Sequence, residues 1–391
     1  MRIAFFGYKA AFDYNHIGGT ESITRRLAKQ LARDDNVEAI DYVFYCAPKR
    51  ETQNPISKLS VRYFPTYAEA AKALGDYDHV VSLYLLPRDR ILYAAFRARH
   101  SHRIQFHALV TQWRNAPLKR LLWLADLQMV PPNGAVFAIS PRLYERVKRW
   151  AKRAFLLLPP VPDEWFLRAS EKPAGSPLRV SFIGRVDPGK GAAEAIELFY
   201  RLRDDKRFSC RFYGYLYEQG RVSPVERELY GRLKALPRGS FVEANYTRYS
   251  PQVDQAVQRA LAETDVLLLP YRDVASTADM PLVFMEGMAS LCALILPQSA
   301  ADLPKVYGPS RFYIRGNEWV ESMLEILSSA NGFLDEERRR LEVRNAELNF
   351  GASAVAHAFK RALVGDEIPR GGGWPDTVLT FRRKTIARLS L

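Results

Sequence analysis

A regular alternation of short apolar segments with amphipathic helical segments is the feature that most constrains this chain. The alternation begins at the N-terminus, stops at a proline-rich stretch over 156–177, and then restarts. Strands that alternate with helices form parallel sheets whose faces the helices cover. Because such crossovers are right-handed, each half should be a doubly wound, Rossmann-like sheet. The sequence therefore predicts an α/β protein with two Rossmann-like domains whose strand ends face a shared cleft.

The pattern divides the 391 residues into three regions, since the chain is too long for one typical core. We expect an N-terminal domain over 1–160, a second domain over 161–348, and a helix with a tail over 349–391 that returns to the first domain. The expected strands cover 2–8, 41–47, 79–86, 103–109, 135–140, 179–184, 210–215, 240–245, 265–271 and 293–297. The expected helices cover 21–33, 68–74, 90–99, 118–127, 141–153, 192–202, 223–236, 252–263, 281–288, 319–329 and 352–364.

The cysteines and the distribution of apolar residues indicate the cellular compartment in which the protein works. The three cysteines, Cys46, Cys210 and Cys292, are far apart, which suits a reducing compartment and gives no metal-ligand spacing. The N-terminus is interpreted as a strand rather than a signal peptide, because Lys9 and Asp13 interrupt its apolar stretch. No apolar run is long enough for a membrane-spanning helix. We therefore expect a cytoplasmic protein.

Positive charge is concentrated in one stretch of the chain. The net charge is +14, and residues 88–153 hold fourteen Lys and Arg against three acids, a net +11. Trp123 and Trp150 lie among these cations, and basic residues with aromatic anchors suit an anionic membrane surface. The protein could then lie peripherally on the inner face of a membrane. The alternative, that these charges are simply solvated, stays open. The C-terminal tail adds Arg382, Arg383, Lys384 and Arg388.

Three segments carry candidate chemistry. Gly184–Gly191 follows an apolar strand and brings Arg185 and Lys190 to the start of a helix, an arrangement that suits a diphosphate. Gly18-Gly19 precede the first helix. These glycines either let the backbone approach a ligand closely or form a plain turn, and the sequence is compatible with both interpretations. Glu286 lies on an apolar helix, where a carboxylate usually needs a partner.

In combination these segments resemble the retaining glycosyltransferases of the B fold, of sucrose-synthase and mannosyltransferase type. The matching residues are Gly18-Gly19-Thr20-Glu21, Gly184-Arg185…Lys190-Gly191 and Glu286-Gly287-Met288-Ala289. Weaker matches are Val136–Ser140 and Leu158–Val161 with Phe166, so the resemblance runs from Met1 to about Val364. It implies transfer of a sugar from a UDP- or GDP-linked donor, with retention and without a cofactor. The implied acceptor is a glycan or a lipid-linked or other anionic molecule.

The resemblance also implies residue roles. Arg185 and Lys190 would neutralise the donor diphosphate, and Glu286 would hold the nucleotide ribose. The Gly18-Gly19 backbone would lie near the diphosphate or the acceptor. His107, at the end of an expected strand, would lie near the transferred sugar, although a hydrogen-bonded strand-end histidine is equally open. Further donor contacts are implied for Gly214, Pro281 and Leu282.

Departures from the family pattern affect the sugar end of the site. Ala278 stands where the family has its first glutamate, so Asp279 is the candidate to reach the sugar hydroxyls. Lys305 stands where many relatives have glutamate, and Tyr215 replaces a glycine after Gly214. A non-catalytic nucleotide-sugar binder with this fold therefore stays open as an alternative.

Other classes fit the sequence less well. Asp76-Tyr77-Asp78 matches the Asp-x-Asp of metal-dependent transferases, but it precedes an expected strand and is interpreted as a turn. Arg185 and Lys190 supply the charge that a metal would bring, so we expect no metal. A pI of 9.6 is typical of nucleic-acid binders, yet no nucleic-acid-binding motif appears. A nicotinamide enzyme would need G-x-G-x-x-G after a strand, which is absent.

Overall fold

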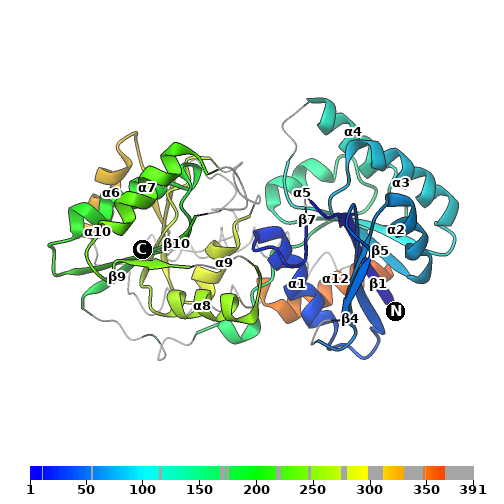
Figure 1. The fold of residues 1–391 in the computed structure, drawn as a ribbon, viewed down its shortest axis with the longest axis horizontal. Coiled ribbons are helices and arrows are strands. Elements are labelled where there is room, and N and C mark those ends of the chain that lie inside the picture. The colour runs from blue at the N-terminus through cyan, green and yellow to red at the C-terminus, as the bar shows by residue number, and fades with distance from the viewer. Residues whose placement is uncertain are drawn as a thin grey trace, which may run out of the picture. The chain divides into compact units, whose positions relative to one another are not determined.

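The computed structural model describes two compact units, each built on its own sheet (Figure 1). The first unit consists mainly of residues 1–160 with 349–365, and the second mainly of residues within 161–348. The described residues are 1–10, 12–53, 56–113, 117–167, 172, 176–216, 222–244, 248–273, 280–297, 311–329, 347 and 349–365.

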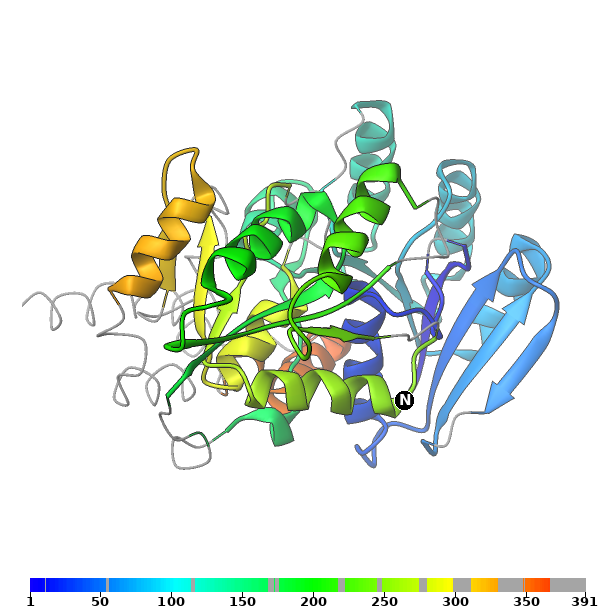
Figure 2. The ribbon, with the colours of Figure 1, turned by 60° about the vertical axis from the view of Figure 1, so that its left-hand side comes forward.

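The sheet of the first unit has eight strands in the order β3-β4-β2-β1-β5-β6-β7-β8. Its central strand β1 is buried along most of its length, as expected for a parallel strand with helices on both sides. β3 pairs antiparallel with β4 at one edge, and the other pairs are parallel; β3 and β4 are blue in Figure 2. The strands are β1 Arg2–Tyr8, β2 Ala39–Tyr45, β3 Arg50–Gln53, β4 Leu59–Phe64, β5 His79–Ser82, β6 Gln105–Val110, β7 Val136–Ala138 and β8 Ala154–Leu156.

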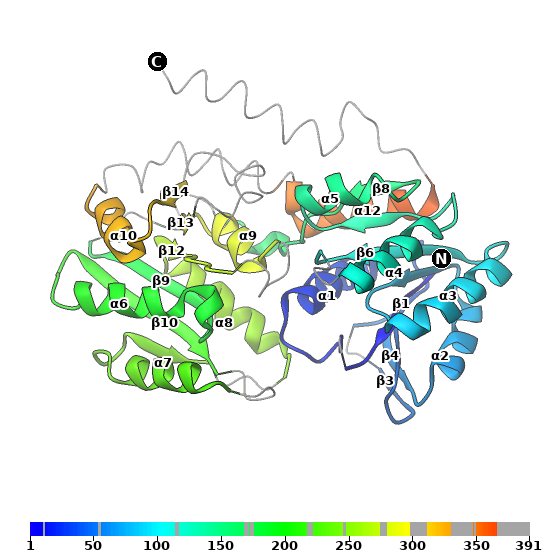
Figure 3. The ribbon, with the colours of Figure 1, turned by 90° about the horizontal axis from the view of Figure 1, so that it is seen from above.

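The last described helix, α12, belongs to the first unit and packs against α1 (Figure 3). The Lys360 ammonium lies 2.6 Å from the Asp34 carboxylate, and the Phe359 ring stacks on Phe5 and packs against Phe137 at a tilt. A segment distant in sequence therefore completes the hydrophobic core beside β1. The helices of this unit are α1 Gly19–Leu31, α2 Tyr67–Ala73, α3 Pro87–His100, α4 Pro117–Gln128, α5 Pro141–Val147 and α12 Ala352–Val364.

The second unit has a parallel sheet of six strands in the order β11-β10-β9-β12-β13-β14. Apolar residues of α6, α7 and α10 form one core cluster with Val180 and Phe182 of β9. The strands are β9 Leu178–Arg185, β10 Phe208–Tyr215, β11 Phe241–Glu243, β12 Val266–Leu268, β13 Ala293–Pro297 and β14 Arg311–Ile314. The helices are α6 Ala192–Leu202, α7 Pro224–Lys234, α8 Pro251–Ala262, α9 Leu282–Ala289 and α10 Trp319–Ser328, with short 3₁₀ turns at Asp163–Trp165 and Pro188–Lys190.

Some helices begin where the local sequence supplies a side-chain cap. Ser223 accepts a hydrogen bond from the Glu226 amide, and the Glu226 carboxylate accepts one from the Ser223 amide, which forms a capping box at α7. Ser140 accepts from the Leu143 amide at α5. Proline at the first helical position supports both starts, because its missing N–H would have no helical partner there.

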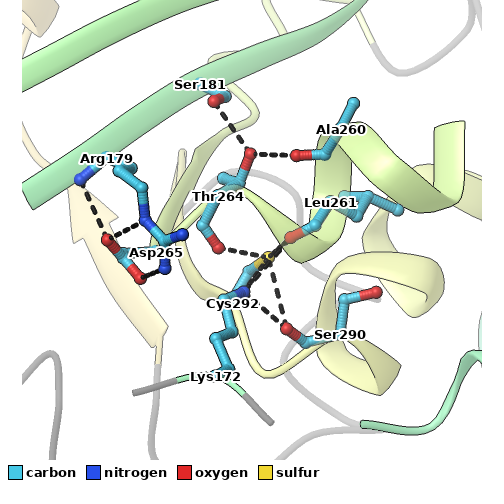
Figure 4. Close-up of polar contacts among 9 residues, drawn as sticks. All are labelled: Lys172, Arg179, Ser181, Ala260, Leu261, Thr264, Asp265, Ser290 and Cys292. Atoms are coloured by element: carbon cyan, nitrogen blue, oxygen red, sulfur yellow. Dashed lines mark hydrogen bonds and ion pairs between the residues drawn. The ribbon is translucent and has the colours of Figure 1, made fainter. Parts of the chain in front are cut away.

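Lys172 ties the segment after the unit boundary to the second unit (Figure 4). Its ammonium donates to the carbonyl oxygens of Leu261 and Ser290, at 3.2 and 2.5 Å, where α8 and α9 end. A cation at helix C-termini is favourable because the last carbonyls carry partial negative charge. The same ammonium lies 3.3 Å from the buried Cys292 sulfur. One side chain thus closes the corner between two helices and covers a thiol.

The structure confirms the α/β class and the two parallel sheets, and it corrects several elements. Expected helix 141–153 ends at Val147, and residues 154–156 form the edge strand β8. Strands β3, β4 and β14 were not expected. Within the described residues, no helix is both long and apolar enough to cross a membrane.

Candidate functional site

The turn between β9 and α6 is shaped by Asp187 and Gly191. The Asp187 carboxylate accepts a hydrogen bond from the Gly189 amide at 2.8 Å and lies 3.2 Å from the Arg185 guanidinium. Gly191 has φ +75°, and a Cβ there would lie 1.9 Å from the carbonyl oxygen of Pro270. Only glycine fits both the left-handed backbone and this close approach. The turn is therefore fixed against the loop that follows β12.

Two cations share this turn. Lys190 is partly buried, and its aliphatic stem passes within 4.0 Å of the position where a Cβ of Gly184 would lie. Burial, with the nearby Arg185 guanidinium, lowers the pKa of Lys190 to about 8, and Asp187 opposes this shift. A lowered lysine pKa means that the ammonium is short of compensating negative charge. The pair is therefore suited to receive an anion.

Glu286 lies in the middle of α9 and is only 4% exposed. Burial and the Glu286 carboxylate raise the pKa of the buried Tyr271, whereas the Arg185 guanidinium lowers it. These effects link Tyr271 electrostatically to residues at both 185–187 and 286. Three segments far apart in sequence thus converge where β9 and β12 end, at the carboxyl edge of the sheet, where ligands of such sheets bind.

The remaining donor candidates of the second unit lie at this edge or at the start of α9. Gly214 pairs with Gly184 across β10 and β9, and a Cβ there would lie 2.9 Å from the Gly184 carbonyl oxygen. Pro281 is the N-cap of α9 rather than its first residue, and Leu282 begins the helix. Gly287 allows α9 to pack on β12, because a Cβ would lie 2.6 Å from the Leu267 side chain.

Gly18 and Gly19 begin α1 in the first unit, and their own helix supplies a carboxylate. Gly18 is the N-cap in an extended conformation, and a Cβ there would lie 2.3 Å from a carboxylate oxygen of Glu21. Burial raises the pKa of Glu21, while its own backbone amide and Arg25 lower it. A carboxylate folded onto a helix N-terminus already satisfies the partial positive charge there.

His107 does not end a strand as expected, because β6 continues to Val110. The residue is fully buried, with Nε2 3.2 Å from His79 Nδ1, and its Nδ1 accepts a hydrogen bond from the Ala135 amide at 3.0 Å. Burial lowers the pKa of His107 well below its usual range. Both ring nitrogens are engaged inside the sheet layer, which favours the alternative of a hydrogen-bonded strand histidine.

Some of the other candidate site residues lie within the described part of the chain, and some lie outside it. Asp279, together with Ala278, Lys305 and the basic tail, lies outside the described residues. Asp76 ends a 3₁₀ turn before β5, and Asp78 accepts a hydrogen bond from the Arg2 amide at 2.8 Å, as expected for a turn. The described part of the chain contains no group of His, Cys, Asp or Glu that could hold a metal.

Asp187 and Tyr271 were missed as site residues. Asp187 precedes a proline and caps the turn that carries Lys190, a combination typical of a helix or turn start. Tyr271 belongs to an expected strand end, but nothing in the sequence shows that it is buried beside Glu286. The Asp187 signal was available from the sequence, whereas the Tyr271 position needed the fold.

Comparisons with known proteins agree with this architecture. No protein-family model and no curated protein matches the chain. Solved structures match it over nearly its full length. Anabaena HepE in complex with UDP-glucose gives a TM-score of 0.64 at 11% identity, covering 93% of this chain and 99% of HepE. Trehalose-6-phosphate synthase OtsA gives 0.63 at 11%, covering 93% and 99%. A glycosyltransferase from Rickettsia africae ESF-5 gives 0.63 at 11%, covering 93% and 97%. The chain therefore has the B fold found in these glycosyltransferases.

Proposed function

We propose that this protein is a retaining glycosyltransferase that takes a sugar from a UDP- or GDP-linked donor. The observation that carries the proposal is the convergence of Arg185, Lys190 and Glu286 at the carboxyl edge of the second sheet. The fold, shared with a protein solved in complex with UDP-glucose, supports it. Cations would meet the diphosphate, and a buried carboxylate would accept hydrogen bonds from the ribose hydroxyls.

The proposed chemistry follows from where charge develops. The bond between the sugar C1 and the phosphate oxygen breaks, which leaves negative charge on the diphosphate and positive charge on the sugar. Arg185 and Lys190 stabilise that negative charge most strongly at the transition state. The acceptor oxygen bonds to C1 on the same face, and its proton passes to the departing phosphate oxygen. Two fixed cations supply the charge that a metal supplies elsewhere, so the proposed reaction is metal-independent.

The acceptor we propose is a glycan that is lipid-linked, or another anionic molecule. The support is the net +11 over residues 88–153, which belong to the first unit. Anionic acceptors are drawn to a unit that carries this excess of positive charge by long-range attraction.

A second candidate is a non-catalytic nucleotide-sugar binder. Ala278 in place of the family's first glutamate favours it, since the sugar end would then lack a carboxylate. Slow release of UDP from a UDP-sugar without acceptor separates the two. The enzyme hydrolyses its donor slowly, while the binder leaves it intact.

The direct test is calorimetric titration with UDP, GDP and ADP. Binding of none of these at millimolar concentration would contradict both candidates. The ribose contact is tested by Glu286→Gln, which we expect to weaken UDP binding about tenfold, because the ribose hydroxyls would then donate to a neutral amide oxygen in place of a carboxylate. Inorganic pyrophosphate, which has no ribose, should bind the variant as it binds the parent. Glu263→Gln, an exposed carboxylate of the same unit, is the matched control.

A further inference from the structure

We propose that the outer face of helices α3 and α4 docks on an anionic lipid bilayer. This face, called the α3–α4 face below, is defined by Ile91, Leu92, Leu118 and Leu121. They are 68%, 54%, 71% and 62% exposed. They are among the most exposed large apolar side chains of the described residues. Exposed apolar clusters of this kind mark interaction surfaces in water-soluble proteins.

Helical spacing puts these residues on one stripe of each helix. In α3 the exposed residues include Arg88, Ile91, Leu92, Ala95 and Arg99, whose spacings of three or four place them on one stripe. In α4 the exposed residues Leu118, Leu121 and Ala125 recur in the same way, and the exposed Met129 follows directly after the helix. The opposite sides hold the buried residues Tyr93, Trp123 and Leu127. The leucines are therefore not needed by the core of the first unit.

The two helices are held side by side by one buried carboxylate. Asp126 of α4 lies 2.5 Å from the Arg90 guanidinium and 2.6 Å from that of Arg97, both on α3. Figure 1 shows α3 and α4 as neighbours in the same unit. These ion pairs hold together the two helices that carry the exposed apolar residues of the α3–α4 face.

The same burial leaves the α3–α4 face without exposed acids. Asp89 and Asp126 are the carboxylates of the two helices, and they are 4% and 3% exposed. Arg88, whose side chain is 77% exposed, and the exposed Arg99 flank the apolar residues of α3. An apolar stripe bordered by arginines complements a bilayer that offers an acyl interior beneath anionic headgroups.

Binding of the full-length protein to vesicles tests this proposal. We expect co-sedimentation with phosphatidylcholine vesicles that contain phosphatidylglycerol, and much weaker binding to phosphatidylcholine alone. Leu118→Ser with Leu121→Ser should lower the affinity for the mixed vesicles at least about tenfold, because inserted apolar area is lost. Val225→Ser with Val364→Ser, which alters two exposed helical valines elsewhere, should leave binding unchanged.

Charge is tested separately from apolar insertion. Arg88→Gln with Arg99→Gln should lower the affinity for the mixed vesicles about tenfold or more. Added salt should weaken the binding of the parent protein to the same vesicles. Thermal unfolding of each variant shows that it still folds. The proposal is overturned if the parent does not bind the mixed vesicles, or if the leucine variant binds as tightly as the parent. A parent dimer that the leucine variant dissociates, without vesicle binding, would identify a second copy as the occupant.

This docking goes beyond the proposed transfer reaction and can fail independently of it. The α3–α4 face belongs to the first unit, whereas Arg185, Lys190 and Glu286 belong to the second. UDP titration without vesicles reports on the proposed donor site, which the second unit supplies. If the parent protein binds UDP but does not bind the mixed vesicles, only the docking is contradicted.

Discussion

The two units share one local arrangement at a helix start but differ in the charged side chains that lie beside it. In both, the central strand of a parallel sheet leads through a glycine to a helix, β1 to α1 and β9 to α6. At α1 the helix start is covered by the carboxylate of Glu21. At α6 the first-turn carboxylate of Glu194 is paired with the Arg272 guanidinium at 2.6 Å, and the preceding turn carries Arg185 and Lys190.

The difference shows that a glycine before a helix does not by itself make an anion site. The helix N-terminus attracts negative charge in both units, but in the first that charge is supplied from within the chain. In the second, the two cations of the turn, Arg185 and Lys190, outnumber its carboxylate, Asp187. We therefore expect the diphosphate contacts to be dominated by the second unit.

The largest expected effect is that of removing both cations of the second unit. Arg185→Ala with Lys190→Ala should weaken UDP binding about a hundredfold or more, because two charge-assisted contacts are lost. Calorimetry measures the change. Arg203→Ala with Lys206→Ala removes the same net charge from exposed positions of that unit and is the control. Equal losses in both double variants would mean that only general charge attracts the nucleotide.

A smaller effect separates the two glycines. Gly191→Ala should lower the free energy of unfolding by roughly 2 kcal/mol or more, since it combines a left-handed φ with a backbone clash. Gly18→Ala should cost less than about 1 kcal/mol, because φ is extended and only the end of the Glu21 side chain must shift. Urea unfolding measures both. Similar costs would argue against the difference between the turns.

The smallest expected effect concerns pH. Lys190 loses its proton as pH rises through about 8, so UDP affinity should fall between pH 7.5 and 9, by up to about tenfold. The first unit has no such lysine at its helix start. Lys190→Met should bind UDP more weakly throughout and lose this pH dependence. A parent protein whose affinity is flat over this range would show that Lys190 does not contact the anion.

The sequence predicted the elements that depend on local pattern. Helices 192–202 and 352–364 were expected at the bounds now observed, because apolar periodicity and flanking glycines define them. The Arg185 and Lys190 turn was recognised because its glycines and charges are adjacent in sequence. The polar strand Arg50–Gln53 was missed, since an edge strand needs no apolar face.

Residues whose meaning depends on distant partners could not be predicted. His107 was expected at a strand end, yet β6 extends three residues further, and the His107 side chain lies 3.2 Å from that of His79, 28 positions earlier. Tyr271 acquires its setting from Glu286 and Arg185, which only the fold brings near. A count of charges along the sequence also cannot show that Asp126 is buried between Arg90 and Arg97. Because it is buried, its negative charge is not exposed on the α3–α4 face.

The three cysteines should react with a thiol reagent at three different rates, and the Lys172 contacts set the slowest. Cys46 is exposed and should react with a thiol reagent at once, while burial raises the pKa of Cys210 to about 12 and slows it. Cys292 can react only after Lys172 leaves the ends of α8 and α9. Its labelling rate therefore counts openings of that corner rather than thiol acidity. The labelling rate of Cys292 in the native chain thus measures how often the second unit opens locally at the ends of α8 and α9.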